Sequence, residues 1–391
     1  MDSLQLHLGA RNKFAHPSVV TGMPHSKLFT EFTVPARSGA GLKLRNRVVL
    51  PPMCQYSVEK RDGVPTTWHL AHLGSMAHGG YSLVIAEATA VAAEGRISDR
   101  DTGLWNDEQA EAWKPIAQYI RSHGAAAGVQ LAHAGAKAST YGWLKDLEEA
   151  GKSGSISADD GGWETFTSSP SELYGLKPAT AMSVEQIQAS VQDWADAAKR
   201  ADAAGFDLIQ IHAAHGYLVH QFLSPLTNKR TDEYGGSFEN RTRYLREVIE
   251  AVAAVWPENK ALGIRFSGED WVDDGWSIAD TVRIAKELYG YGVRHFDLSS
   301  AGIGKFNGPS GPGYQVPLAQ AVKEALPQDA FVTAVGVITE PMQAEQIVVT
   351  GQADGVCVGR AALGDPQWAN RSAQELGAPM AFPAQYWRGR W

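Results

Sequence analysis

The segment that decides the fold runs from residue 183 to 212 and reads SVEQIQASVQDWADAAKRADAAGFDLIQIH. Its first part is typical of a helix: Ser183 precedes Gln186 by three residues, as in a capping box, and apolar residues then recur at helical spacing. Gly205 ends that pattern, and the apolar run 208–212 indicates a buried strand. A helix that leads directly into a buried strand is one repeat of a parallel β/α fold.

The same alternation extends over most of the chain and predicts eight strands. They are Val48–Pro51, Leu83–Ala88, Ala126–Leu131, Leu208–His212, Leu262–Phe266, His295–Ser299, Phe331–Val335 and Gly355–Val358. Helical patterns separate them, and no Pro/Gly-rich linker divides the chain. Eight such repeats close most economically into one barrel. We therefore predict an α/β fold, a single-domain (β/α)8 TIM barrel with a long insertion after the third strand.

That insertion is the main departure from a regular barrel. About fifty residues rich in Gly, Ser and Asp, 132–182, separate the third strand from the helix after Ser183. A connection of this length usually carries function or forms a lid. We predict an N-terminal extension over residues 1–27 and a barrel over 28–391, the barrel including an insertion at about 138–182 and a C-terminal tail at 384–391.

Composition excludes several classes of protein. The 391 residues are 44% hydrophobic and 20% charged, as in soluble globular proteins, and the net charge of −8 argues against general binding to nucleic acid or to anionic membranes. No apolar run is long enough to span a bilayer, and residues 1–25 do not resemble a secretory signal, so we expect a cytoplasmic protein. Cys54 and Cys357 lie far apart in the sequence, which disfavours a disulfide framework, a structural zinc site and an iron–sulfur cluster.

Active sites of TIM barrels lie at the C-terminal ends of the strands. In this sequence many polar or distinctive residues are expected there: Pro52, Met53, Cys54, Gln55, Tyr56, Glu87, Ala88, Thr89, Gln130, His133, Lys137, His212, His215, Tyr217, Arg265, Ser299, Ser300, Gly336, Gly359 and Arg360. The loops after strands seven and eight often bind phosphate in this fold, so Gly336, Gly359 and Arg360 either form a phosphate site or are turn residues. Neither a G-x-G-x-x-G dinucleotide motif nor a P-loop motif is present.

His212 and His215 are open to three interpretations. They are metal ligands, hydrogen-bond donors to a carbonyl oxygen, or structural residues at a strand end; the H-E-x-x-H motif is absent. Tyr217 carries a hydroxyl that can donate a proton, although its ordinary pKa of ~10 makes it a slow acid. Lys137 is of a type that forms Schiff bases in barrel enzymes, but it lies several residues beyond its strand in a Gly/Ala-rich loop, which favours a solvated or phosphate-facing lysine. Cys54 is a nucleophile or an ordinary buried thiol.

Five motifs carry a family resemblance: PPMCQYS (51–57), AEATAV (86–91), QLAHAG (130–135), HAAHGYL (212–218) and FLSPLTN (222–228), the last continuing into RTDEYGGS (230–237). With them the sequence resembles the Old Yellow Enzyme family, in particular its thermophilic-like (xenobiotic reductase) branch. The motifs occur in order across nearly the whole chain from Leu28 onward.

The resemblance implies non-covalent FMN with NADPH or NADH as hydride donor. Pro51, Pro52, Met53 and Cys54 would line the flavin, Ala88 and Gln130 would contact its isoalloxazine ring, and Arg265 would face the N1/C2 region. Gly359 and Arg360 would hold the phosphate, with Gly336 beside them. Each role is carried over from the family's motifs onto the matching residue.

It also implies an ene-reductase acting on an enone or nitroalkene. His212 and His215 would bind the substrate's oxygen, Tyr217 would donate the proton, and Tyr56 would help to close the pocket. Arg388, in the tail, would reach the active site of a neighbouring subunit, which makes the protein a homo-oligomer. The competing interpretation is a metal-dependent hydrolase or lyase on a TIM barrel that uses His212 and His215.

Three features depart from the family pattern. Ala136 stands where this branch usually has Arg, the Gly/Ser-rich stretch 150–171 is absent from compact members, and the first 27 residues lie outside the resemblance.

Overall fold

The structure is a computed structural model that describes residues 26–170 and 175–389. Apart from its last two residues, the predicted extension 1–27 lies outside the described residues. Eight parallel strands form a closed barrel. In barrel order they are β3 (Val48–Leu50), β4 (Leu83–Ala90), β5 (Ala126–Ala132), β8 (Leu208–Ala213), β9 (Ala261–Ser267), β10 (His295–Ser299), β11 (Phe331–Ala334) and β12 (Gly355–Cys357). Every predicted strand is confirmed to within two residues at each end.

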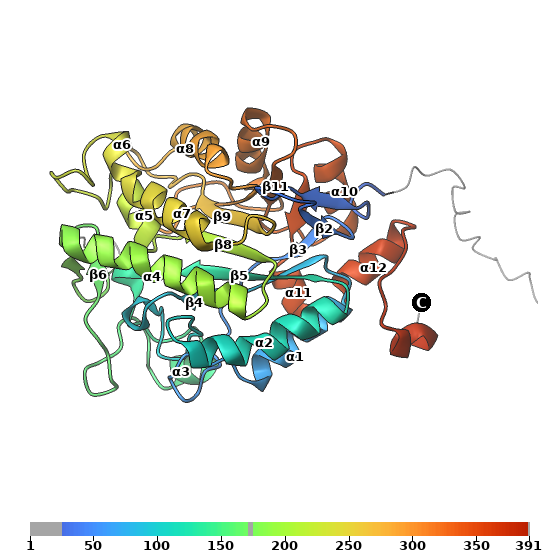
Figure 1. The fold of residues 1–391 in the computed structure, drawn as a ribbon, viewed down its shortest axis with the longest axis horizontal. Coiled ribbons are helices and arrows are strands. Elements are labelled where there is room, and N and C mark those ends of the chain that lie inside the picture. Colours follow the sequence, from blue (N-terminus) through green and yellow to red (C-terminus); the bar gives the residue numbers. More distant parts are fainter. Residues whose placement is uncertain (1–25, 171–174, 390–391) are drawn as a thin grey trace, which may run out of the picture.

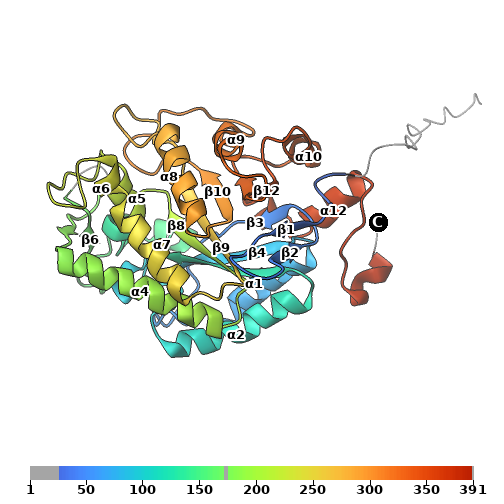
Figure 2. The same ribbon diagram turned by 45° about the horizontal axis from the view of Figure 1, so that its top comes forward.

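Helices surround the barrel on its outer side (Figures 1 and 2). The longer ones are α1 (Thr67–His78), α2 (Asp107–Ser122), α4 (Val184–Ala203), α7 (Arg243–Val255), α8 (Ile278–Gly290), α9 (Val316–Ala325), α10 (Pro341–Val349) and α12 (Trp368–Glu375). The capping box of α4 is confirmed: the Gln186 N–H donates to Ser183 Oγ at 3.2 Å, and the Ser183 N–H donates to Gln186 Oε1 at 2.9 Å. None of the helices in the described ranges is both long and apolar enough to cross a membrane.

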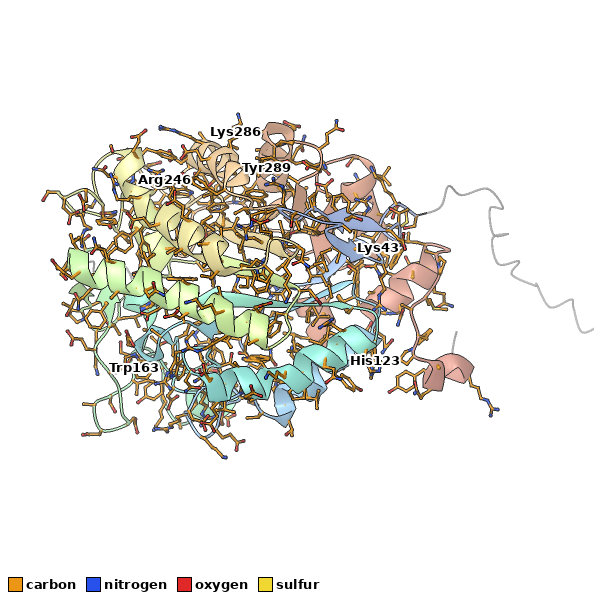
Figure 3. The ribbon with its side chains drawn as sticks, in the orientation of Figure 1. Lys43, His123, Trp163, Arg246, Lys286 and Tyr289 are labelled. Atoms are coloured by element: carbon orange, nitrogen blue, oxygen red, sulfur yellow. The ribbon has the colours of Figure 1, made fainter. Side chains whose placement is uncertain are left out.

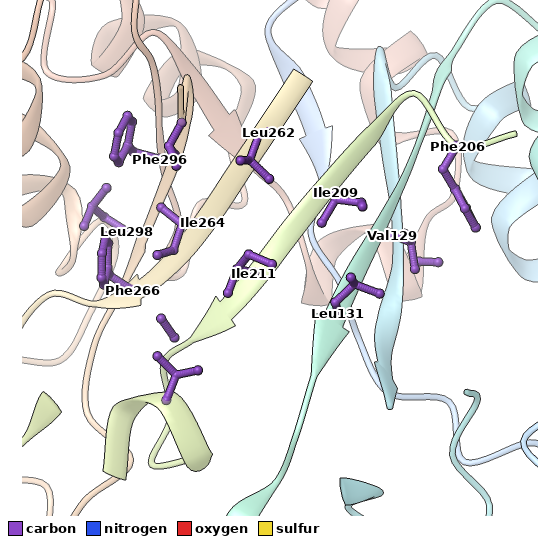
Figure 4. Packing of buried hydrophobic residues seen from close by; sticks show 14 of the residues in the cluster. Val129, Leu131, Phe206, Ile209, Ile211, Leu262, Ile264, Phe266, Phe296 and Leu298 are labelled. Atoms are coloured by element: carbon purple, nitrogen blue, oxygen red, sulfur yellow. The ribbon is translucent and has the colours of Figure 1, made fainter. Parts of the chain in front are cut away.

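The main core lies between the barrel and these helices (Figure 4). Ile209 and Ile211 on β8 pack there with Val129 of β5, and each is fully buried. Burial of one such side chain stabilises the fold by roughly 1.5–3 kcal/mol. Because side chains alternate along a strand, the residues between them, including Gln210 and His212, face the barrel interior. The pattern that builds the core therefore also directs polar groups inward.

A short hairpin that the sequence analysis did not anticipate closes one end of the barrel. It consists of β1 (Phe32–Val34) and β2 (Leu42–Leu44), which pair antiparallel. The Phe32 ring packs against Phe331 with centroids 4.8 Å apart, within a second apolar cluster that includes Leu83 and Leu208. These residues begin their strands, so the hairpin covers the N-terminal end of the barrel and leaves the C-terminal end for a site.

The insertion lies at the opposite end of the molecule from the hairpin, as Trp163 and Lys43 show (Figure 3). It contains the short elements α3 (Lys145–Glu149), β6 (Phe166–Thr167) and β7 (Thr180–Ala181). The remaining short elements are η1 (Ala93–Gly95), η2 (Gly135–Lys137), α5 (Leu218–Leu223), α6 (Phe238–Arg241), α11 (Arg360–Gly364) and η3 (Ala384–Gly389). The insertion is thus placed to overhang the C-terminal ends of the strands.

Candidate active site

The loop after β8 brings three predicted site residues together. The rings of His212 and His215 have centroids 5.2 Å apart, and those of His212 and Tyr217 are 4.9 Å apart. His215 has a positive φ of 59°, a strained backbone conformation for a residue other than glycine. This turn allows both imidazoles and the phenol to approach one another within one short loop.

Contacts from the ends of β9, β10 and η2 fix His215. Its N–H donates to Ser267 Oγ at 2.8 Å, and its Nε2 shares a hydrogen bond of 2.8 Å with Ser299 Oγ. Lys137 Nζ donates to its carbonyl oxygen, also at 2.8 Å. The loop after β10 approaches so closely that a Cβ on Gly302 would lie 2.1 Å from the carbonyl carbon of His215. The imidazole is therefore held in place before any ligand binds.

We expect Gly302→Ala to lower the free energy of unfolding by about 1–3 kcal/mol more than Gly311→Ala. Both glycines have a positive φ, 112° and 120°, but nothing lies within 4 Å of the Cβ position at Gly311. The matched pair separates backbone strain from the contact with His215. Urea titration of both variants measures the difference, and equal losses of unfolding free energy would show that the contact of residue 302 with His215 does not affect stability.

Lys137 is not the solvated lysine that the sequence analysis favoured. Its side chain is partly buried in the site, and Nζ lies 5.0 Å from the centroid of the Tyr217 ring. Burial lowers the pKa of Lys137 to about 8. A positive charge therefore lies beside the phenol at neutral pH.

Burial also sets the protonation states of His212, His215 and Tyr217. Together with the nearby Arg265 charge, it lowers the pKa of His212 and of His215 well below the usual value, so both imidazoles are neutral at pH 7. Burial raises the pKa of Tyr217 well above its usual value, so its hydroxyl keeps the proton. The site thus presents two neutral imidazoles and one protonated phenol.

The loop after β3, which contains the predicted residues 51–56, is fixed by a buried histidine–carboxylate pair. The Gln55 N–H donates to Glu87 Oε2 at 2.6 Å, while Glu87 Oε1 lies 2.9 Å from His69 Nε2. The N–H of Thr66 donates to His69 Nδ1 at 2.8 Å, so the proton of the neutral ring is on Nε2. Cys54 packs beside Ala88 and Tyr217, and burial raises the pKa of its thiol well above the usual value.

A second buried histidine–carboxylate pair, His220 with Asp270, supports the loop that contains Tyr217. His220 Nε2 lies 3.0 Å from Asp270 Oδ1, and the Gly216 N–H donates to His220 Nδ1 at 2.9 Å. Ser224 Oγ donates to the same carboxylate at 2.7 Å, and His220, Asp270 and Ser224 are fully buried. The sequence analysis assigned no role to Glu87, His69, His220 or Asp270. Their spacing gives no signal, because each pair joins residues distant in the sequence.

Asp101, in the loop after β4, was also missed. Its carboxylate accepts hydrogen bonds from Ser98 Oγ and from the Ile97 N–H, both at 2.7 Å. Burial raises the pKa of Asp101 to about 7 despite these hydrogen bonds. It is therefore a buried carboxyl group that titrates near neutral pH within this end of the barrel.

Polar side chains fill the barrel beneath the site. Gln130 Nε2 donates to Gln210 Oε1 at 2.8 Å, and Arg265 Nε lies 3.1 Å from Asp297 Oδ2. Gln210 is fully buried, and within the described part of the chain its Nε2 has no hydrogen-bond partner. A buried amide N–H left unpaired costs free energy, so this group is suited to a polar ligand.

The predicted phosphate residues follow β11 and β12, which are neighbours in the barrel. Gly336 has a φ of 121°, and a Cβ there would lie 2.9 Å from Gln315 Nε2. Gly359 precedes α11, whose first residue, Arg360, is exposed. The strand order thus places Gly336 and Gly359 after neighbouring strands, in turns of the kind whose backbone N–H groups can face an anion.

A cavity of about 510 Å3, the inner cavity, lies beside the segments that carry His215 and Tyr217. Its lining includes Tyr56, Lys137, His215 and Tyr217, together with Ile97, Thr140, Tyr141, Trp143, Gly154, Leu176, Gly302 and Gly304. The insertion therefore forms one wall, as the overhang suggests. Arg388 is exposed on η3 and does not line it.

The metal interpretation of His212 and His215 finds no support in the geometry. Within residues 26–170 and 175–389, no group of three His, Cys, Asp or Glu side chains is arranged to hold a metal ion. His215 Nε2 instead bonds to Ser299, and His212 Nδ1 accepts the Ala214 N–H at 3.3 Å.

Comparisons with known proteins agree with this geometry. Residues 27–378 match the NADH:flavin oxidoreductase / NADH oxidase family. The chain is 42% identical to the NADPH dehydrogenases of Bacillus cytotoxicus and Bacillus subtilis, over 93% of its length and 97% and 99% of theirs. Morphinone reductase superposes with a TM-score of 0.72 at 25% identity, with 92% of each chain covered.

The fold is also shared with larger enzymes. A 2-naphthoyl-CoA reductase complex superposes with a TM-score of 0.77 at 23% identity, and this chain spans about half, 53%, of that protein. From the family match, the close relatives and the barrel, the chain belongs to the NADH:flavin oxidoreductase / NADH oxidase family, the Old Yellow Enzyme family of FMN-dependent oxidoreductases.

Proposed function

We propose that this oxidoreductase is an ene-reductase that reduces activated C=C bonds of α,β-unsaturated carbonyl compounds or nitroalkenes. The observation that carries the proposal is the grouping of neutral His212, at the end of β8, with neutral His215 and protonated Tyr217, which line the inner cavity from the loop that follows. These groups can hydrogen-bond a substrate oxygen and deliver one proton.

The end of the barrel fits FMN. Gln210 Nε2 is a buried donor without a partner among the described residues, Arg265 is a buried cation paired with Asp297, and Gly336 and Gly359 follow neighbouring strands. In this proposal Pro51, Pro52, Met53, Cys54, Ala88, Gln130 and Arg265 contact the flavin, and Gly336, Gly359 and Arg360 hold its phosphate. The chemistry that FMN supplies when bound is hydride transfer from NADPH or NADH to an electron-poor carbon.

His212 and His215 bind and polarise the substrate oxygen. Because His212 Nδ1 accepts the Ala214 N–H, its Nε2 carries the proton and is the donor toward the substrate. Hydrogen bonds to the carbonyl or nitro oxygen withdraw electron density from the β-carbon and stabilise the negative charge that develops on oxygen. The contacts to Ser267, Ser299 and Lys137 keep His215 oriented throughout.

Tyr217 donates the proton that completes the reduction at the α-carbon. Its raised pKa keeps the hydroxyl protonated until a basic carbon forms, and the Lys137 charge stabilises the phenolate that remains. Tyr56 also lines the inner cavity and helps to close it in this proposal. The Glu87–His69 and Asp270–His220 pairs maintain the two loops that carry these groups.

Arg388 completes the cavity of a neighbouring subunit in this proposal, so the enzyme is a homo-oligomer. Tyr386, two residues earlier, packs against His78 with ring centroids 5.9 Å apart. His78 ends α1, which runs antiparallel to the strands and therefore ends near the closed side of the barrel. The tail thus starts far from the cavity of its own chain.

An absorbance spectrum followed by anaerobic titration tests the function. We expect a flavin band near ~450 nm that bleaches with NADPH and returns when cyclohexenone is added. A band that bleaches but does not return with cyclohexenone or a nitroalkene would contradict alkene reduction.

We expect Lys137→Met to remove a pH dependence from alkene reduction. Since the pKa of Lys137 is about 8, its charge is present at pH 7 and is lost as the pH rises through about 8. The wild-type rate should therefore fall above pH 8, and the rate of the variant should not. At pH 7 the variant should be roughly 5- to 10-fold slower than wild type, because a cation–π contact contributes about 1 kcal/mol. Stopped-flow reoxidation by cyclohexenone between pH 6.5 and 9.5 measures both, and the same fall in the variant would exclude Lys137 as its source.

A further inference from the structure

The inner cavity continues into a second cavity built only from the insertion. This outer cavity, of about 420 Å3, is lined by residues 141–145, Glu148 and residues 152–154. It shares Tyr141, Trp143 and Gly154 with the inner cavity. A ligand that lies beside Tyr217 can therefore extend outward along the insertion.

The inner cavity is larger than a single ring requires. A cavity of about 150 Å3 holds a benzene ring, whereas this one has about 510 Å3. Among the described residues, none of those proposed to contact FMN lines it, so the space belongs to the other ligands. A simple cyclic enone would leave most of it to water.

Two aromatic side chains stand where the cavities join. The side chain of Trp143 is 93% exposed, so its indole is almost unpacked in the single chain. Tyr141, by contrast, is fixed: its hydroxyl donates to Asp160 and accepts the Ser157 N–H at 3.3 Å, and its own N–H donates to the Gly154 carbonyl at 2.9 Å. One aromatic wall is therefore rigid and the other is available to cover a ligand.

Lys145, Glu148 and Lys152 line the outer cavity, and both lysines are in ion pairs. Lys152 lies 2.9 Å from Asp160, and Lys145 lies 3.5 Å from Glu149. Neither sign is in excess at these pairs, so the electrostatics do not favour a phosphate or a carboxylate. Flat aromatic walls without net charge are suited to an uncharged planar ring.

We propose that Tyr141 and Trp143 form a subsite for an uncharged planar ring at the end of the substrate distal to its reacting C=C bond. The inference rests on the proposed function, because it places the reacting end beside His215 and Tyr217. It assigns the insertion a role in selectivity: enones or nitroalkenes that carry an aryl group are preferred over small ones.

Binding of two phenols to the oxidised holoenzyme tests the subsite without turnover. Phenol fills only the reacting end, and 4-phenylphenol adds one uncharged ring. We expect wild type to bind 4-phenylphenol at least ~10-fold more tightly than phenol, Trp143→Ala to lose most of that ratio, and Trp143→Phe to keep it. Met342→Ala, at an exposed apolar residue on α10, is the matched control and should keep the full ratio.

The remaining outcomes are decisive as well. An unchanged ratio in Trp143→Ala, or an equal loss in Met342→Ala, would overturn the subsite. So would a loss of NADPH affinity in Trp143→Ala with an intact phenol ratio, since the ring bound there would then be the adenine of the reductant. If cyclohexenone reduction fails while the phenol ratio responds to Trp143, the proposed function is wrong and the ring subsite stands.

Discussion

Tyr217→Phe should slow alkene reduction by about 10²- to 10⁴-fold, the usual contribution of a positioned general acid. The substitution removes only the hydroxyl, and the ring can keep its contacts with His212 and Lys137. Flavin reduction by NADPH needs no proton from this residue, so that half-reaction should change less than about threefold. Stopped-flow measurement of the two half-reactions separates the effects.

The comparison between half-reactions is the control for this variant. Equal losses in both would mean that Tyr217 positions ligands rather than donates the proton. A substrate whose reduction leaves a stable anion should be affected less, because its reduction does not need the proton of Tyr217 at once. A nitroalkene, which yields a resonance-stabilised nitronate, serves as that probe.

Asp270→Ala should lower the free energy of unfolding by about 3–5 kcal/mol, because it leaves buried donors on His220, Ser224 and Trp276 without their acceptor. Burial alone would raise the pKa of Asp270, but the His220 imidazole, with hydrogen bonds from Ser224 and the Trp276 N–H, lowers it. Since the folded-state pKa is depressed, this stabilisation is present above the ordinary carboxyl pKa of ~4 and is lost only as the pH falls further.

Urea titration at pH 7.5 measures the loss, with Asp196→Ala as control. Asp196 pairs with Lys199 at 2.8 Å on the surface of α4, and exposed pairs contribute about 0–1 kcal/mol. A loss in Asp270→Ala no larger than that of the control would show that the buried pair does not stabilise the Tyr217 loop.

The barrel was predictable because its strands are continuous apolar runs, which are typical of strands buried on both faces. Segments such as 208–212 are uniformly buried, and Gly205 and Asp207 separate this one from the helix before it. The β1–β2 hairpin was not predicted, since strands of three residues are too short to show a period. Its stability comes from contacts such as Phe32 with Phe331, which join positions about three hundred residues apart.

The residues that face the cavity were easier to predict than those behind them. His212, His215 and Tyr217 share one loop, so sequence proximity already implies spatial proximity. The error on Lys137 has a different origin: its distance from the strand end suggested solvent, but η2 turns the chain back toward His215. The two histidine–carboxylate pairs depend on tertiary contacts and leave no local pattern.

The hairpin beneath the barrel has a kinetic consequence. With the N-terminal end covered by Phe32 and its neighbours, ligands of the inner cavity exchange at the other end of the barrel. In the proposed enzyme, oxidised nicotinamide must dissociate before an alkene can bind, so no ternary complex forms and the two ligands compete for one space. Excess of either then inhibits turnover, and the physiological rate depends on the ratio of reductant to alkene rather than on either concentration alone.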